Sequence, residues 1–138
     1  MNNMKKIILF FALLSTLIAC GETCYNAPQP IVFEFVNSND DNLITTGILT
    51  DIIIKESNNQ PIKITKTESD KIVLENVGSY HGTKEYTFTS NIKFFNFSIE
   101  SSEFNAGCEG YQINKLTFTG TAFDVVEENG YYKIIFDY

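Results

Sequence analysis

Residues 123–136 have the sequence FDVVEENGYYKIIF, in which two apolar, alternating segments flank Asn129 and Gly130. Asn-Gly readily adopts the positive φ angles of a two-residue type I′ turn, so this stretch predicts a β-hairpin. The turn fixes the register, with Glu128 opposite Tyr131. Opposed residues share a face, which predicts one apolar face and one more polar face. The apolar face consists of Phe123, Val125, Ile134 and Phe136, and the other face carries Asp124, Val126 and Lys133.

The chain before this hairpin contains further short segments rich in Ile, Val, Phe, Tyr and Thr, separated by clusters of Asn, Asp, Ser and Gly. With both arms of the hairpin, the segments are 31–36, 48–55, 61–66, 71–77, 84–90, 92–100, 111–120, 121–128 and 131–138. A spacing of about 8 to 12 residues is typical of an antiparallel sandwich. We therefore predict an all-β domain over residues 31–138, a single antiparallel β-sandwich, Ig-like or similar, of about seven to nine short strands.

Alternation within these segments predicts which side chains form the core, and most of them are phenylalanine or isoleucine. The predicted core residues are Ile31, Phe33, Phe35, Ile72, Leu74, Phe95, Phe97 and Ile99. Phe94 falls outside the alternation and is expected to point away from the core. Pro61 opens its segment, which suits a strand start or an edge position where a missing N–H is harmless.

The first 19 residues have the organisation of a secretory signal peptide, with Lys5 and Lys6 before an apolar run from Ile7 to Leu14. The run is too short to cross a bilayer, which requires about 20 apolar residues. We expect residues 1–19 to be removed. Residues 20–30, CGETCYNAPQP, then form the N-terminus of the mature chain and a short linker to the β-domain.

The residues LIAC, 17–20, resemble the lipobox of bacterial lipoproteins. The resemblance implies that Cys20 is acylated, palmitate being a typical chain, and becomes the first residue of the mature protein. Acyl chains of this kind would hold the protein on a bilayer almost permanently. We expect a lipid-anchored protein of the cell envelope, at the outer membrane, on either its periplasmic or its surface face. The alternatives are cleavage after Ala19 that leaves a free thiol, and a buried cysteine behind an ordinary apolar segment.

Two cysteines remain once Cys20 is assigned to lipid, and the compartment permits disulfides. The simplest pairing joins Cys24 to Cys108 and closes a loop of 84 residues. Two free thiols are one alternative, and a metal or redox site is another. The chain has no C-x-x-C motif, however, and its single histidine, His81, is a poor basis for a zinc site, which usually needs four N or S ligands.

The mature chain is strongly acidic. Without the two lysines of residues 1–19 it retains eight lysines, no arginine and all 17 acidic residues, a net charge of −9. Nucleic acid is therefore excluded as a partner, because binding to phosphates requires clustered cations. A cationic partner suits this charge better, although acidity that only keeps a surface domain soluble is the simpler interpretation.

The candidate chemical sites are few. His81 lies between glycines in GSYHGTKEY, as expected of an exposed turn, and the motifs of nucleophilic or phosphate-binding sites are missing. Asp124, Glu127 and Glu128 are carboxylates at a hairpin end, where solvent would surround them. The loop 37–42, NSNDDN, could offer oxygen ligands to calcium, but Asn and Asp also favour turns. We predict no catalytic residue, no metal site and no cofactor.

The later residues CEGYQINKLTFTGTAFD, 108–124, together with APQPIVFEFV, 27–36, resemble small all-β lipoproteins of Bacteroidota. The resemblance implies an envelope location and a sandwich fold, without a known reaction. We expect a non-enzymatic binding or structural module that engages another envelope protein. An acidic inhibitor or immunity-type protein against a cationic envelope hydrolase or toxin is the alternative, and a small-ligand carrier or an enzyme is a second one.

Overall fold

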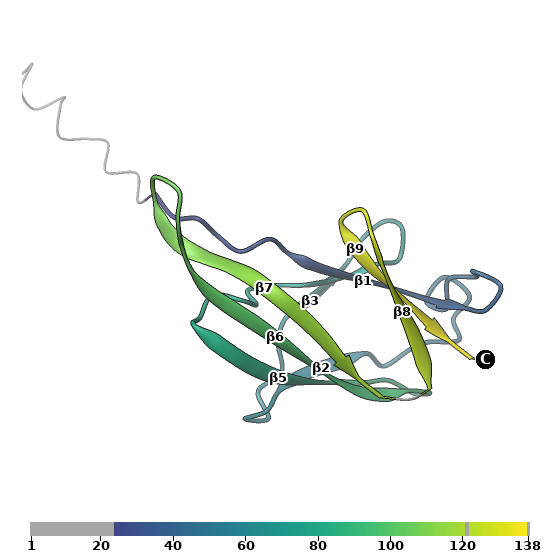
Figure 1. Cartoon of the computed structure of the whole chain (residues 1–138). Coiled ribbons are helices and arrows are strands. Elements are labelled where there is room, and N and C mark those ends of the chain that lie inside the picture. The colour runs from purple at the N-terminus through teal and green to yellow at the C-terminus, as the bar shows by residue number, and fades with distance from the viewer. Residues whose placement is uncertain (1–23, 121, 138) are drawn as a thin grey trace, which may run out of the picture.

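The computed structural model describes residues 24–120 and 122–137, which form two packed β-sheets (Figure 1). One sheet has the strand order β3-β4-β1-β9-β8, and the other has the order β2-β5-β6-β7. The strands are β1 (Ile31–Asn37), β2 (Ile53–Glu56), β3 (Ile64–Lys66), β4 (Ile72–Leu74), β5 (Gly82–Thr89), β6 (Phe94–Asn105), β7 (Glu109–Thr119), β8 (Phe123–Glu128) and β9 (Tyr131–Phe136). The predicted all-β sandwich is confirmed. The expected signal segment and Cys20 lie outside the described residues.

Each of the nine segments expected from the sequence overlaps one strand. The largest difference is in residues 48–55, where only the last three residues belong to β2. Asp51 has a φ angle of 54°, which interrupts the extended chain. Leu49 is nevertheless buried, so the first half of this segment contributes to the core from a loop.

The C-terminal hairpin has the predicted register, with Glu128 opposite Tyr131 and the pairing continuing to Phe123 opposite Phe136. The predicted type I′ turn is wrong, because Gly130 has a φ angle of +89° whereas the φ angle of Asn129 is not positive. β9 also pairs with β1, and this ladder is parallel, whereas the other six ladders of the described chain are antiparallel. β1 therefore lies between β4 and β9, near the centre of its sheet.

Aromatic rings fill the space between the two sheets. The ring of Phe33 meets that of Phe97 edge to face at 5.4 Å between centroids, and Phe88 stacks on Phe95 at 4.6 Å. Such pairs stabilise a core by about 0.5 to 1.5 kcal/mol beyond the burial of their area. All the predicted core residues are buried, namely Ile31, Phe33, Phe35, Ile72, Leu74, Phe95, Phe97 and Ile99.

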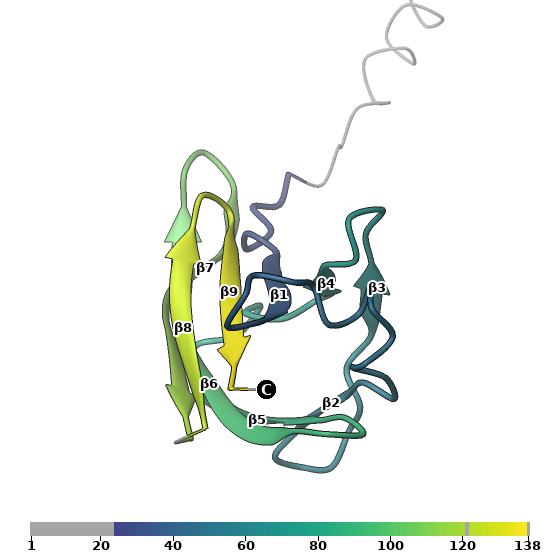
Figure 2. The ribbon, with the colours of Figure 1, turned by 90° about the vertical axis from the view of Figure 1, so that its right-hand side faces the viewer.

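The β6–β7 hairpin is the longest element of the fold and runs to one end of the molecule (Figure 1). Its pairing continues to Asn105 and Glu109, next to the tip. Figure 2 shows the tip at the same end of the sandwich as residues 24–30. β7 is also the edge strand of its sheet, so its outer side has no neighbouring strand among β1–β9.

Candidate functional site

Residues 24–30 are attached to the start of β7. Cys24 forms a disulfide with Cys108, as the sequence predicts, and their Cα atoms are 5.3 Å apart. The side-chain amide of Asn26 donates to the carbonyl of Cys108. The sequence predicts a linker here, and the structure shows that this linker is bonded to the domain through Cys24 and Asn26.

The backbone of Asn26 acts as a short extra strand beside β7. Its amide donates to the carbonyl of Glu109 at 2.9 Å, and its carbonyl accepts from the amide of Tyr111 at 3.1 Å. These two bonds form a parallel bridge between Asn26 and Gly110. Within residues 24–120 and 122–137, this bridge covers only the first part of the β7 edge.

Two glycines allow the N-terminal segment to approach so closely. A β-carbon on Gly110 would overlap the carbonyl group of Asn26. A β-carbon on Gly78 would lie 2.7 Å from Cγ1 of Ile113 and 3.3 Å from Cβ of Pro28, and the φ angle of Gly78 is +86°. The absence of side chains at both positions is therefore what makes room for the segment.

A groove of about 420 Å³ lies beside this attachment, at the end of the β6–β7 hairpin. Its lining residues are Tyr25, Glu103, Phe104, Asn105, Glu109, Gly110 and Tyr111. Tyr25 is 54% exposed and its hydroxyl donates to Oγ of Ser79 at 3.2 Å, while Phe104 is 39% exposed. We call this region the hairpin-tip groove. It combines three aromatic side chains with two carboxylates and contains no lysine.

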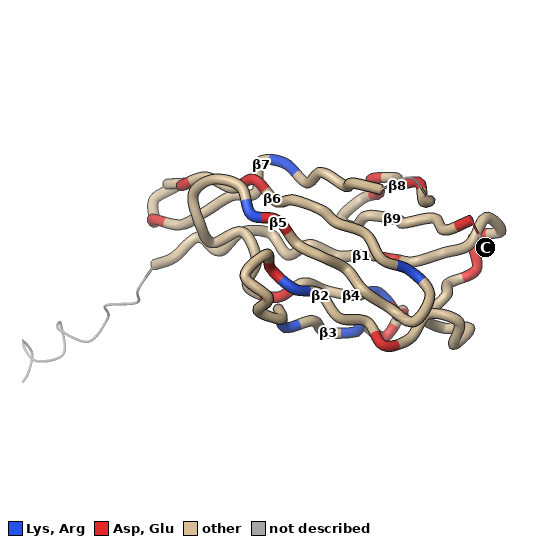
Figure 3. The backbone as a smooth tube through the Cα atoms, turned by 90° about the horizontal axis from the view of Figure 1, so that it is seen from below, with Lys and Arg blue, Asp and Glu red and all other residues tan. Residues whose placement is uncertain are grey.

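The charge around the hairpin-tip groove is negative. Figure 3 shows acidic positions at the tip of the β6–β7 hairpin, whereas the strands further along carry both signs. Glu103 and Glu109 are exposed, and neither forms an ion pair with a residue of the described chain. Anionic surfaces are therefore disfavoured neighbours of this end of the molecule.

The opposite end of β6 carries the most exposed large apolar side chain of the described residues. Phe94 is 65% exposed, on the outer face of the four-stranded sheet. It pairs with Thr89 of β5, and Thr89 pairs with Ile53 of β2, which is 47% exposed. Phe94, Thr89 and Ile53 form a row across three strands, which we call the β6-start patch.

The outer face of the other sheet is occupied by ion pairs. Nζ of Lys71 lies 3.7 Å from a carboxylate oxygen of Glu34 and 3.2 Å from the ring centroid of Tyr131. Nζ of Lys133 lies 2.8 Å from Oδ1 of Asp40. This contact raises the pKa of Lys133, since it favours the charged amine.

The candidate calcium loop, residues 37–42, is satisfied by its own contacts. Oδ1 of Asn37 accepts from the amides of Asn39 and Asp41, each at 2.9 Å, and Nδ2 of Asn37 donates to Oδ2 of Asp41 at 3.0 Å. The Asp40 carboxylate is directed to Lys133 instead. These contacts are those of an Asx-type turn between strands.

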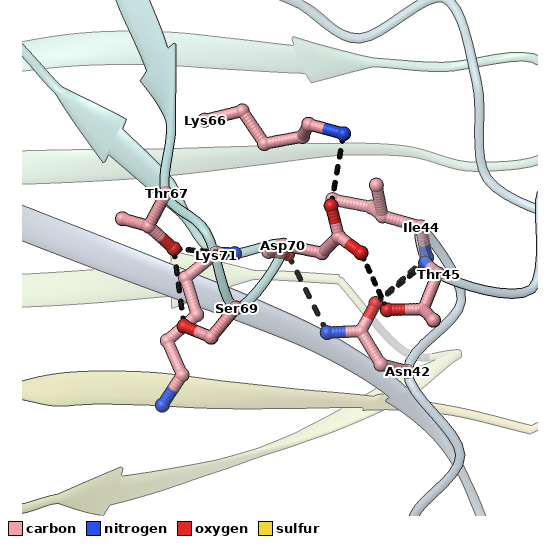
Figure 4. Close-up of polar contacts among 8 residues, drawn as sticks. All are labelled: Asn42, Ile44, Thr45, Lys66, Thr67, Ser69, Asp70 and Lys71. Atoms are coloured by element: carbon pink, nitrogen blue, oxygen red, sulfur yellow. Dashed lines mark hydrogen bonds and ion pairs between the residues drawn. The ribbon is translucent and has the colours of Figure 1, made fainter.

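A second polar cluster connects the loop after β1 to the β3–β4 turn (Figure 4). Oδ1 of Asp70 pairs with Nζ of Lys66 at 2.8 Å, and Oδ2 accepts from the Thr45 hydroxyl at 2.7 Å. Lys66 first, and Thr45 second, hold the pKa of Asp70 below its usual value. Asn42 caps the same loop by accepting from the amides of Ile44 and Thr45. The cluster fastens two turns together.

The remaining candidate residues lie at the surface. His81 is exposed in a bend before β5, and Asp124, Glu127 and Glu128 are exposed on β8. Among the residues that the structure describes, no group of three His, Cys, Asp or Glu side chains could hold a metal ion. A search of the same residues for a helix long and apolar enough to cross a membrane also finds none.

Comparison of the chain with family models, with curated proteins and with solved structures found no match. The hairpin-tip groove and the β6-start patch are therefore known from the geometry of this chain alone. The alternation of residues 92–100 indicated beforehand that Phe94 points away from the core, whereas the sequence analysis did not single out the aromatic side chains of the hairpin-tip groove.

Proposed function

We propose that the protein is an envelope lipoprotein, anchored through an acylated Cys20, that acts as a non-enzymatic binding or structural module. The attachment of residues 24–30 supports this role, because it fixes the domain only four residues from the lipid-bearing cysteine. A disulfide and two backbone hydrogen bonds hold that segment, and the absence of side chains at Gly110 and Gly78 leaves room for it. Only three residues thus separate the proposed membrane anchor from the disulfide.

The observation that carries the proposal is the placement of the β6-start patch. β6 extends from Phe94 to Asn105, so the patch and the hairpin tip lie at opposite ends of one strand. At about 3.3 Å per residue the two ends are about 35 Å apart. A module anchored at the hairpin-tip end therefore presents Phe94 and Ile53 away from the anchor, where an envelope protein can bind.

Large apolar side chains surrounded by polar ones suit a protein partner. Phe94 has 65% of its surface exposed, and the neighbouring outward side chains Asn96 and Thr87 are polar and hydrogen-bond each other at 2.9 Å. Aromatic anchors within a polar rim are typical of the centres of protein interfaces. Aromatic rings occupy the space between the sheets, which favours binding at the surface over carriage of a ligand within the core.

The test is photo-crosslinking in cells that express the full chain. A photoreactive phenylalanine analogue replaces Phe94 or, as a control, the exposed Val126 on the other sheet. We expect a defined envelope protein to be captured from residue 94 alone, and Phe94→Ser to abolish its co-purification while Val126→Ser does not. Equal capture from both positions, or none from either, would exclude the β6-start patch as the binding surface.

The identity of the captured protein decides between the two binding roles. A basic hydrolase or toxin that is released as salt rises would support the inhibitor alternative, because the mature net charge of −9 steers such partners. A salt-insensitive envelope complex would support the structural role. Acylation is tested separately, by the mass of the N-terminal peptide from the wild-type chain and from Cys20→Ala.

A further inference from the structure

The spacing of two cysteines restricts which end of the sandwich can approach the membrane. Cys20 and Cys24 are separated by four chain links, which cannot span more than about 14 Å. Cys24 is bonded to Cys108, between the end of β6 and the start of β7. If Cys20 carries the acyl chains, the tip of the β6–β7 hairpin must therefore lie within a short distance of the lipid surface.

The side chains exposed at that end have the chemistry of a membrane interface. Tyr25 is 54% exposed and Phe104 is 39% exposed, with Tyr111 half-buried beside them in the same groove. Aromatic side chains are enriched at the headgroup level of membranes, where an apolar ring meets the lipid and a hydroxyl remains hydrated. Phe104 is at the hairpin end itself, one residue before Asn105.

We propose that the hairpin-tip groove rests on the bilayer, with Phe104 and Tyr25 inserted at the headgroup level, and thereby sets the orientation of the anchored domain. This inference rests on the proposed acylation of Cys20. The lipid surface is a zwitterionic one, because Glu103 and Glu109 lie at the groove and would be repelled by anionic headgroups.

A weak contact between the hairpin-tip groove and the bilayer is sufficient to orient the anchored domain. The acyl chains already hold the domain at the surface, so insertion of the hairpin tip is an intramolecular event with a high effective concentration. Because β6 and β7 are strands of the four-stranded sheet, contact at the hairpin tip orients the whole sandwich. Contact at the tip then directs the far end of β6, with Phe94, away from the lipid.

The chain contains no tryptophan, so one introduced tryptophan gives an unambiguous fluorescence signal. We would compare Phe104→Trp with Phe94→Trp, which lies on the same strand at the opposite end and is more exposed. Each full-length, acylated variant is reconstituted into vesicles of phosphatidylcholine and phosphatidylethanolamine, with or without brominated acyl chains. Thermal melting of each variant confirms that it is folded.

We expect the brominated lipid to quench the Phe104→Trp variant several times more strongly than the Phe94→Trp variant. Equal quenching of the two, whether weak or strong, would overturn the inference and leave the anchored module intact. An N-terminal peptide without acyl mass, or failure to float with vesicles, would overturn the proposed function and this inference with it. Hydroxyl-radical footprinting of the unsubstituted chain is a second measurement, in which vesicles should protect Tyr25 and Phe104 but not Phe94.

Discussion

The carbonyl group of Asn26 occupies the space that a β-carbon on Gly110 would need. The two residues are 84 positions apart in the chain and form a parallel bridge through the backbone atoms of Glu109 and Tyr111. Gly110 is buried in this contact. The start of β7 and the N-terminal segment therefore fit together only while residue 110 has no side chain.

Substitution of Gly110 should separate the N-terminal segment from β7. We expect Gly110→Ala to lower the free energy of unfolding by about 1 to 3 kcal/mol, the usual cost of forcing extra volume into a packed site. Gly47→Ala is the control, because a β-carbon there meets no atom and only the strain of its φ angle of +73° remains. Urea unfolding measures both variants. A Gly110→Ala loss no larger than that of Gly47→Ala would show that the contact is easily displaced.

The disulfide should be a major source of stability. On the chain-entropy model, a bond that closes a loop of 84 residues stabilises the folded state by about 4 to 5 kcal/mol. We expect the double substitution Cys24→Ser, Cys108→Ser to move the urea midpoint down accordingly. The wild-type chain with added reductant should show the same decrease in urea midpoint. An unchanged midpoint in both cases would mean that the bridge and glycine contacts alone retain the N-terminal segment.

The Asp70 cluster should contribute to stability in a pH-dependent way. Lys66 and Thr45 lower the pKa of Asp70 in the folded state. The contribution is therefore present above the unfolded pKa, near 3.8, and is lost as pH falls through the lower folded value. We expect Asp70→Asn to destabilise at neutral pH, with the difference from wild type disappearing in strong acid.

The matched control for Asp70 is Asp124→Asn, at an exposed position of β8 that forms no ion pair within the described chain. Asparagine also suits residue 70 because it tolerates the positive φ angle of 55° found there. Thermal melts from pH 2 to 7 provide the comparison. If the difference in melting temperature between Asp70→Asn and wild type were constant across this range, the contribution of the cluster would not depend on the charge of Asp70.

The sequence predicted local features of the fold and missed most non-local ones. The hairpin of residues 123–136 was predictable to its register, because Asn129 and Gly130 define the turn and the alternation of both arms agrees with it. The parallel pairing of β1 with β9 was not, since alternation shows which face of a strand is buried but not the direction of its neighbour. The β2 segment was predicted too long because the apolar residues of 48–55 continue past Asp51, where a positive φ angle interrupts the extended chain.

The hairpin-tip groove was only partly predictable. Its aromatic rings come from Tyr25, Phe104 and Tyr111, which are distant in sequence and meet through the disulfide and the β6–β7 turn. The predicted Cys24–Cys108 pairing joins the N-terminal segment to residue 108, but it does not place these aromatic side chains. The close approach of Asn26 to Gly110 had no local signal, because a glycine within a strand-like segment indicates several different features.

Tyr86, a buried core residue, forms a hydrogen-bonded pair with Tyr80, which packs against the core. The hydroxyl of Tyr86 donates to that of Tyr80 at 3.3 Å, and the Tyr80 hydroxyl donates to the carbonyl of Ile99 at 2.9 Å. Burial is the main cause that raises the pKa of each. Tyr80 thus links Tyr86 to the backbone of β6. Loss of the Tyr80 hydroxyl would leave the Tyr86 hydroxyl and the Ile99 carbonyl without this partner.

These hydrogen bonds predict that Tyr80→Phe lowers the free energy of unfolding more than Tyr86→Phe does. Tyr80→Phe should cost about 1 to 3 kcal/mol, because the Ile99 carbonyl and the Tyr86 hydroxyl lose their partner, whereas Tyr86→Phe should cost less.

In alkali the unfolded chain releases tyrosine protons near pH 10 while the folded chain retains them, so stability should fall as pH rises above that value. Tyr86→Phe should flatten this decline. Denaturant unfolding at pH 7 to 11 checks both effects, and an equally steep alkaline decline in Tyr86→Phe would contradict the assignment to this pair.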